Sequence, residues 1–211
     1  MRSKSCGLLL LGLLLAIIAM GCGERGGPVL VGASIDWSPD RPLGWDDFKG
    51  EVPGEEERGD KSASTLHETR YRYTPTITQT PSGRYRATIQ TGSYTTTTTM
   101  IQTGSWVVPT DKTDALLSHE QRHFDLGEVY RRKLAAALQK LEGEGDTPEA
   151  ADEDLARKAE ELRRAMHEAE REQQDRYDQE TDHGRNDEKQ QEWDDRIEGW
   201  LDDPSSAPGP P

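Results

Sequence analysis

The residues of this sequence that most directly suggest chemistry are His119-Glu120-Gln121-Arg122-His123, an HExxH motif. On an α-helix, side chains four residues apart share a face, so the imidazoles of His119 and His123 can bind one metal ion. Glu120 lies at the edge of that face, about 100° round from His119, where its carboxylate can contact a metal-bound water. In zinc hydrolases the ion lowers the pKa of this water toward about 7, and a nearby carboxylate takes its proton. The motif therefore predicts a Zn²⁺ site with Glu120 as the general base.

The sequence around the motif predicts a substantially buried helix, because apolar residues recur there at helical spacing. They are Leu116, Leu117, Phe124, Leu126, Tyr130, Leu134, Ala135 and Leu138. Buried histidines need partners for their ring nitrogens, and a metal ion supplies one. The alternative is a solvated helical face that carries two histidines. With five histidines in 211 residues, chance would produce this motif at a rate of only roughly 0.02.

One ligand is missing from the motif, because a catalytic zinc site takes three protein ligands and a water. We predict His183 as that ligand, since Asp182-His183-Gly184 stands at a chain reversal where a helix ends at glycine. Glu128 lies nine residues after His119, on the opposite face of a straight helix, and could bind only if Gly127 broke the helix. The alternatives that remain open are Asp178, Glu128, Glu168, Glu170 and, as an outside choice, His67.

A sheet and three helices are predicted to position these residues. Residues 62–108 alternate polar with β-branched or aromatic side chains, which predicts three or four antiparallel strands. The motif helix should begin at a cap on Asp111 or Thr113. A second helix should begin at Thr147-Pro148, and a third should cover residues 187–201. The predicted fold class is α+β, with a small antiparallel sheet followed by a long HExxH helix and two further helices.

The N-terminus is typical of an export signal. Arg2 and Lys4 are followed by an apolar run over residues 7–20, which is shorter than a membrane-spanning helix. Small residues then precede Cys22, and this stretch resembles a bacterial lipoprotein cleavage site, although Ala19 stands where leucine is usual. The resemblance implies that Cys22 becomes the lipidated first residue of the mature protein. A plain cleaved signal peptide is the alternative.

Composition narrows the class of protein further. The chain has 26 Lys and Arg against 40 Asp and Glu, with a net charge of −14, so a nucleic-acid partner is disfavoured. Its two cysteines, Cys6 and Cys22, lie within and at the end of the signal, which leaves the mature domain without a disulfide. The expected segments are a signal peptide (1–22), a tether (23–35), a folded domain that contains the HExxH motif (36–201) and a disordered tail (202–211).

Several short motifs resemble those of one bacterial family. They are Leu43-Gly44-Trp45-Asp46-Asp47-Phe48, Ser105-Trp106-Val107, residues 117–125 with Glu128, Tyr177-Asp178, Thr181-Asp182-His183-Gly184, Gln191 and Trp193. Through these motifs, residues 36–200 resemble the bacterial domain-of-unknown-function family 922, whose members are described as candidate secreted zinc-dependent proteases. The resemblance implies that residues 36–201 form a zincin-like metalloprotease domain of α+β fold, with His119 and His123 as zinc ligands and Glu120 as base.

Our first hypothesis is an exported zinc metallopeptidase that cleaves peptide or protein substrates. It would be lipid-anchored through Cys22 to a membrane of the bacterial cell envelope and face the periplasm or the exterior. Tyr177 is a candidate to hydrogen-bond the oxyanion, with simple packing as the alternative. The second hypothesis is a non-catalytic envelope lipoprotein, in which the metal is structural or the acidic helices form an interaction surface. A structural zinc is closed by four protein ligands, whereas a catalytic one keeps a water that faces a cleft.

Overall fold

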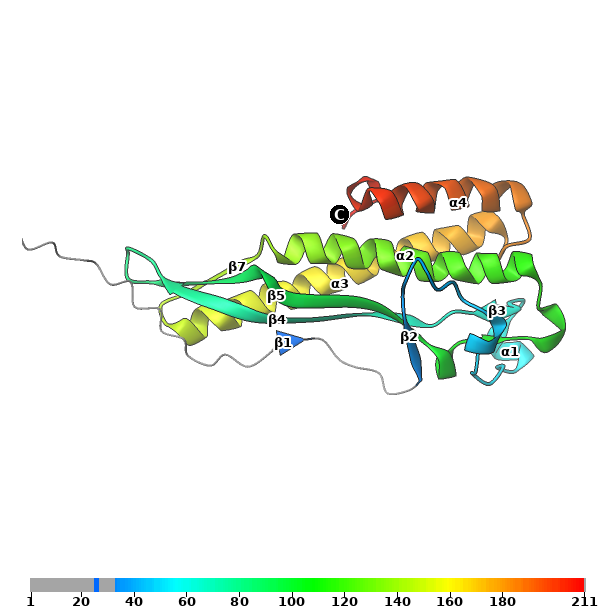
Figure 1. The fold of residues 1–211 in the computed structure, drawn as a ribbon, viewed down its shortest axis with the longest axis horizontal. Helices are drawn as coiled ribbons and strands as arrows, with labels where there is room; N and C mark the ends of the chain where they lie inside the picture. The colour runs from blue at the N-terminus through cyan, green and yellow to red at the C-terminus, as the bar shows by residue number, and fades with distance from the viewer. Residues whose placement is uncertain (1–24, 27–32, 211) are drawn as a thin grey trace, which may run out of the picture.

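The computed structural model of the protein describes residues 25–26 and 33–210 (Figure 1). The expected signal peptide and Cys22 lie outside the described residues. Within the described part, no helix combines the length and the apolar character that crossing a membrane requires. The fold is mixed α/β, with an antiparallel sheet and four α-helices.

The sheet is built on a long two-stranded ribbon of β4 (His67–Gln79) and β5 (Tyr85–Ile101). The threonine run at residues 95–99 pairs with residues 68–72 of β4, as expected for β-branched side chains. Shorter strands pair with this ribbon: β1 (Arg25–Gly26) with β4, and β2 (Ser34–Asp36) and β7 (Glu142–Gly145) with β5. A separate two-stranded sheet contains β3 (Ala63–Ser64) and β6 (Trp106–Val107).

Helix starts follow the capping residues in the sequence. The α-helices are α1 (Glu55–Arg58), α2 (Asp114–Leu138), α3 (Pro148–Thr181) and α4 (Asp187–Asp202). The short 3₁₀ helices are η1 (Trp45–Asp47), η2 (Gln102–Gly104), η3 (Pro109–Asp111) and η4 (Pro204–Ser206). Thr113 caps α2 by accepting a hydrogen bond from Leu116 N, and Thr147 caps α3 by accepting one from Ala150 N. The predicted order of an antiparallel sheet, a long motif helix and two further helices is confirmed; α1 is an addition.

The motif helix α2 lies between the sheet and α4, while α3 runs beside it along the ribbon (Figure 1). The core between the ribbon and the two long helices contains Tyr71, Tyr73, Ala87, Ile89, Leu134, Leu138, Ala151 and Leu155. A second cluster, of Leu126, Tyr177, Trp193 and Ile197, joins α4 to α2 and α3. Strand β7 passes so close to α3 that a Cβ at Gly143 would lie 2.2 Å from the Ala151 carbonyl oxygen. Contacts at both ends of α3 therefore fix it against α2.

The C-terminal tail, which we expected to be disordered, lies against α2. Ala207 is buried. Lys133 Nζ donates hydrogen bonds to the carbonyl oxygens of Pro204 and Ala207, and Tyr130 Oη donates to that of Pro208. Two side chains of α2 thus bind the tail through its backbone carbonyl groups, an interaction that the proline-rich composition of the tail does not reveal.

Candidate metal centre

Three potential ligand atoms meet where α2 faces the C-terminal part of α3. Asp178 Oδ1 lies 3.2 Å from His119 Nε2 and 2.9 Å from His123 Nε2, and the two Nε2 atoms are 3.2 Å apart. Tetrahedral zinc with bonds of about 2.0–2.1 Å holds its ligand atoms roughly 3.3 Å apart. The group His119, Glu120 and His123 can also hold a metal ion, with one ligand atom of each residue within 4.8 Å of the others. The donor set and its spacing fit a divalent cation such as zinc.

Glutamine side chains orient both imidazole rings. His119 Nδ1 lies 3.0 Å from Gln190 Oε1, and His123 Nδ1 lies 2.5 Å from Gln174 Oε1. A proton on each Nδ1, donated to the amide oxygen, leaves the Nε2 lone pair free to bind a metal. The ring of His119 also packs against the backbone at Gly184, where a Cβ would lie 3.0 Å from His119 Cγ. The rings are therefore held in orientations suited to ligation.

Asp178 is held as a carboxylate. Burial alone would raise its pKa, but the contacts of the carboxylate with His119 and His123, the nearby charge of His123 and a hydrogen bond from Lys61 hold the pKa well below its usual range. Lys61 Nζ donates to Asp178 Oδ2 at 2.9 Å, which leaves Oδ1 directed at the two imidazoles. Burial lowers the pKa of His123, but Asp178, Glu120 and Gln174 raise it above its ordinary value. A proton therefore competes with a metal ion for this ring.

Glu120 is buried, with 3% of its surface exposed, and its Oε2 accepts a hydrogen bond from Thr65 Oγ1 at 2.6 Å. Thr65 directly follows β3, so the segment between β3 and β4 restrains the carboxylate. A cavity of about 350 Å³ opens beside these groups. Its walls include residues 61–65, the three motif residues His119, Glu120 and His123, and Asp178. A ligand in this cavity can reach both the histidines and Glu120.

The candidates for the third ligand lie in different places. His183 Nδ1 is 3.4 Å from Asp178 Oδ2, and the residue has a left-handed backbone (φ 54°) in the predicted chain reversal. Glu128 forms ion pairs with Arg131 and Arg132, and Glu170 lies against His67. Glu168 forms an ion pair with Arg171 on the surface. Among the described residues, Asp178 is the candidate with an oxygen close to both Nε2 atoms, while the prediction of His183 as ligand stays a prediction.

Tyr177 is fully buried, and its ring stacks on that of His119 with centroids 4.5 Å apart. Its hydroxyl donates to the backbone carbonyl of His119, and Gln190 Nε2 donates to the hydroxyl at 2.8 Å. Burial raises the pKa of this phenol well above its ordinary value. These contacts favour the packing alternative for Tyr177, and its predicted catalytic role stays a prediction.

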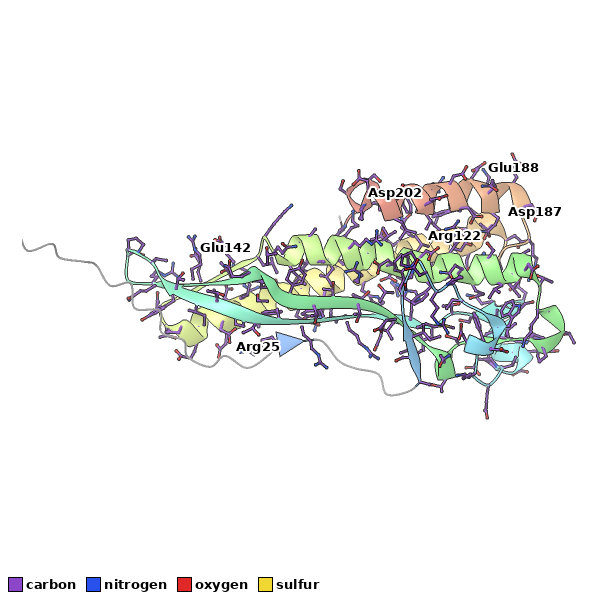
Figure 2. All side chains as sticks on the ribbon, in the orientation of Figure 1. Arg25, Arg122, Glu142, Asp187, Glu188 and Asp202 are labelled. Atoms are coloured by element: carbon purple, nitrogen blue, oxygen red, sulfur yellow. The ribbon has the colours of Figure 1, made fainter. Side chains whose placement is uncertain are left out.

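Gly127 does not break α2, which is continuous from Asp114 to Leu138. A Cβ at this position would lie 2.6 Å from His67 Nε2 and Cδ2. The glycine thus makes room for a histidine of β4 against the motif helix. On the opposite side of α2, Arg122 extends toward α4 and donates to Asp194 (Figure 2). Sequence reasoning did not identify these contacts, nor Thr65, Gln174 and Gln190, because all of them join residues far apart in the chain.

Taken together, these features define a mixed α/β protein with an HExxH-type candidate metal centre beside an open cavity. Residues 51–184 match the family of bacterial proteins of unknown function DUF922, and the chain belongs to this family. The predicted family is therefore confirmed. Searches of curated proteins and of solved structures gave no match.

Proposed function

We propose that this protein is an exported zinc-dependent peptidase with a zincin-like fold, anchored to the cell envelope through Cys22. His119, His123 and Asp178 would hold the metal, which supplies a Lewis acid and an acidified water when it is bound. The observation that carries the proposal is the convergence of three ligand atoms at about 3 Å spacing beside an open cavity. Glu120, a buried carboxylate next to these ligands, supports hydrolysis as the type of reaction.

Glu120 is the general base in this proposal. Its carboxylate would take a proton from the attacking water and pass it to the amine that leaves. The hydrogen bond from Thr65 to Oε2 fixes the orientation of the carboxylate. Because Asp178 would supply the third ligand atom, Glu120 would remain free for proton transfer.

The strand edge beside the cavity supports a peptide as substrate. Val108 N donates to Ser62 O, and Ile101 N donates to Leu66 O. In antiparallel pairing, alternate residues face the partner strand, so the backbone groups of Ala63, Thr65 and His67 point the other way. An extended peptide can hydrogen-bond to such an edge as an added strand. This edge borders the cavity that contains the histidines and Glu120.

A structural metal is the competing function, because the grouping of Glu120 with His119 and His123 would allow it to close the site as a fourth ligand. The test uses the chain without residues 1–22, which retains every described residue. We expect about one zinc per chain and cleavage of a peptide library that a chelator abolishes and zinc restores. Glu120→Gln should keep the zinc and lose cleavage. Loss of zinc from Glu120→Gln, with no cleavage by the wild type, would instead indicate a structural site.

A further inference from the structure

A second cavity, of about 260 Å³, lies next to the first. Thr65, His67 and Gln174 line both cavities, so the two share a wall. The first cavity follows residues 61–65, which include β3, and the second follows residues 65–69, which include the start of β4. Opposite the strand, the second cavity is lined by one face of α3, from Arg163 to Gln174. The two cavities therefore lie in succession along one segment of chain, which runs from β3 into β4, and along one helix.

The strand edge stays open along the second cavity. Trp37 N donates to Thr98 O, so Thr98 bonds toward β2 and its β4 neighbour Thr69 points away from β5. The outward backbone groups thus continue from Thr65 through His67 to Thr69. Among the described residues, a strand pairs with the outer edge of β4 only farther along, where β1 meets residues 72 and 73. A peptide bound beside the metal centre could extend along this edge without displacing a described strand.

The lining of the second cavity favours a large neutral side chain. Apolar groups are supplied by Leu66, Tyr130, Leu134 and Met166. Leu66 is 42% exposed, so its apolar surface is accessible to a ligand. The volume accommodates an aromatic or long aliphatic side chain, whereas a methyl group would leave most of the cavity empty.

The charged residues of the lining already have partners. Glu170 Oε1 lies 2.6 Å from His67 Nε2, and the ion pairs Arg163–Glu160 and Arg171–Glu168 occupy the two arginines. A charged ligand would therefore gain little here and would lose its hydration. Two buried polar atoms of the lining, His67 Nδ1 and Thr69 Oγ1, have no hydrogen-bond partner among the described residues. Buried polar groups normally have a partner, so these atoms indicate a place for a ligand that can form hydrogen bonds.

We propose that the second cavity is a specificity pocket, which binds an aromatic or long aliphatic side chain of a peptide added along residues 63–69. This inference rests on the proposed peptidase function for its biological meaning. Thr65 contacts Glu120, and Thr69 is four strand residues farther on, roughly 13 Å away. The side chain in the pocket would therefore belong to a residue two to four positions from the bond that is cleaved.

A binding experiment tests the pocket without requiring catalysis. The probes are the N-acetyl amides of L-phenylalanine, L-leucine, L-alanine and L-glutamate, added to the isotope-labelled chain without residues 1–22. We expect the phenylalanine and leucine amides to shift the NMR signals of residues 65–69 and Met166, with affinity at least about tenfold higher than for alanine or glutamate. Met166→Trp should fill the pocket and remove this binding, whereas the matched control Met166→Leu should retain it. Circular dichroism and zinc content identify any variant that has not folded.

Two results would overturn the proposal. One is equal binding of the alanine and phenylalanine amides, and the other is phenylalanine binding that Met166→Trp leaves unchanged. Cleavage of a peptide library is measured separately. If the wild type cleaves nothing but the phenylalanine amide binds as expected, the peptidase proposal fails and the pocket stands. If the wild type cleaves peptides without a preference that Met166→Trp changes, the pocket fails and the peptidase stands.

Discussion

Replacing Asp178 with asparagine should weaken zinc binding much more than replacing His183 with alanine. Asp178 Oδ1 lies within 3.2 Å of both imidazole Nε2 atoms, whereas His183 approaches only the second oxygen of Asp178, at 3.4 Å. Asp178→Asn keeps the shape of the side chain but removes the negative charge that would face the metal. His183→Ala removes an outer partner of the carboxylate.

The size of the effect follows from metal affinity. Loss of an outer partner typically costs about 10–100-fold in affinity, so loss of a direct anionic ligand should cost at least about 100-fold. With free zinc at about 1,000 times the wild-type Kd, binding stabilises the folded state by about 4.1 kcal/mol, and a 100-fold weaker site gives about 1.4 kcal/mol. The difference of about 2.7 kcal/mol corresponds to a fall of about 5–11 °C in the zinc-saturated Tm.

Competition with a chromophoric chelator measures the Kd, and thermal unfolding with and without zinc measures the stabilisation. The increment in Tm caused by zinc is compared within each variant, so that effects on the metal-free protein cancel. His183→Ala should lose no more than about tenfold in affinity, near the lower end for an outer partner. A greater loss for His183→Ala than for Asp178→Asn would refute the assignment of Asp178 and restore His183 as the third ligand.

Three further substitutions test other parts of the site. Tyr177→Phe should destabilise the fold by about 1–3 kcal/mol in urea unfolding, because it removes buried hydrogen bonds. The kcat of the variant should stay close to that of the wild type. A fall of about 100-fold in kcat would instead support the oxyanion role of Tyr177. Gly127→Ala should lower the free energy of unfolding by about 1–3 kcal/mol in thermal unfolding, since the added Cβ would lie 2.6 Å from the His67 ring. Unchanged stability would contradict this close packing. Burial raises the pKa of Glu170, but His167 and His67 lower it to about 2. Because this pKa is depressed on folding, the stability it contributes is present above the unfolded value of about 4.3 and is lost as pH falls from there toward about 2. Glu170→Gln should therefore show a flatter acid-unfolding profile, and an unchanged profile would show that the pair contributes nothing.

Local patterns were sufficient to predict the elements that carry the site. The apolar spacing around the motif predicts α2, and Thr113 caps it. Thr147-Pro148 marks the start of α3, and the threonine run lies in a strand. Each of these signals acts over a few residues of sequence. They also predict that His119 and His123 share a helix face, and their Nε2 atoms lie 3.2 Å apart.

Which residues of α3 lie opposite the two histidines depends on how α3 is positioned along α2. Local sequence patterns do not specify this position. A simple helical hairpin with its turn near Gly145 would place residues 165–171 opposite the motif, yet Gln174 and Asp178 lie there. Strand β7 explains the difference. Its four residues (Glu142–Gly145) lead away from α2 to pair with β5, over a distance of roughly 13 Å. Helix α3 then needs about nine more residues, at 1.5 Å each, to return to the motif.

The division of the site among distant elements also determines what a bound metal would do to the fold. The two histidines belong to α2 and Asp178 to α3, so a metal would link the two helices at the end opposite β7. At the β7 end, the helices already share a core with the ribbon through Leu138 and Leu155. Glu120 is bound to Thr65 rather than to α3, so this link would leave its carboxylate on the strand side of the cavity. One side of the cavity would thus be tightened by the metal, while the other, with the proton acceptor and the open strand edge, would stay available to a peptide.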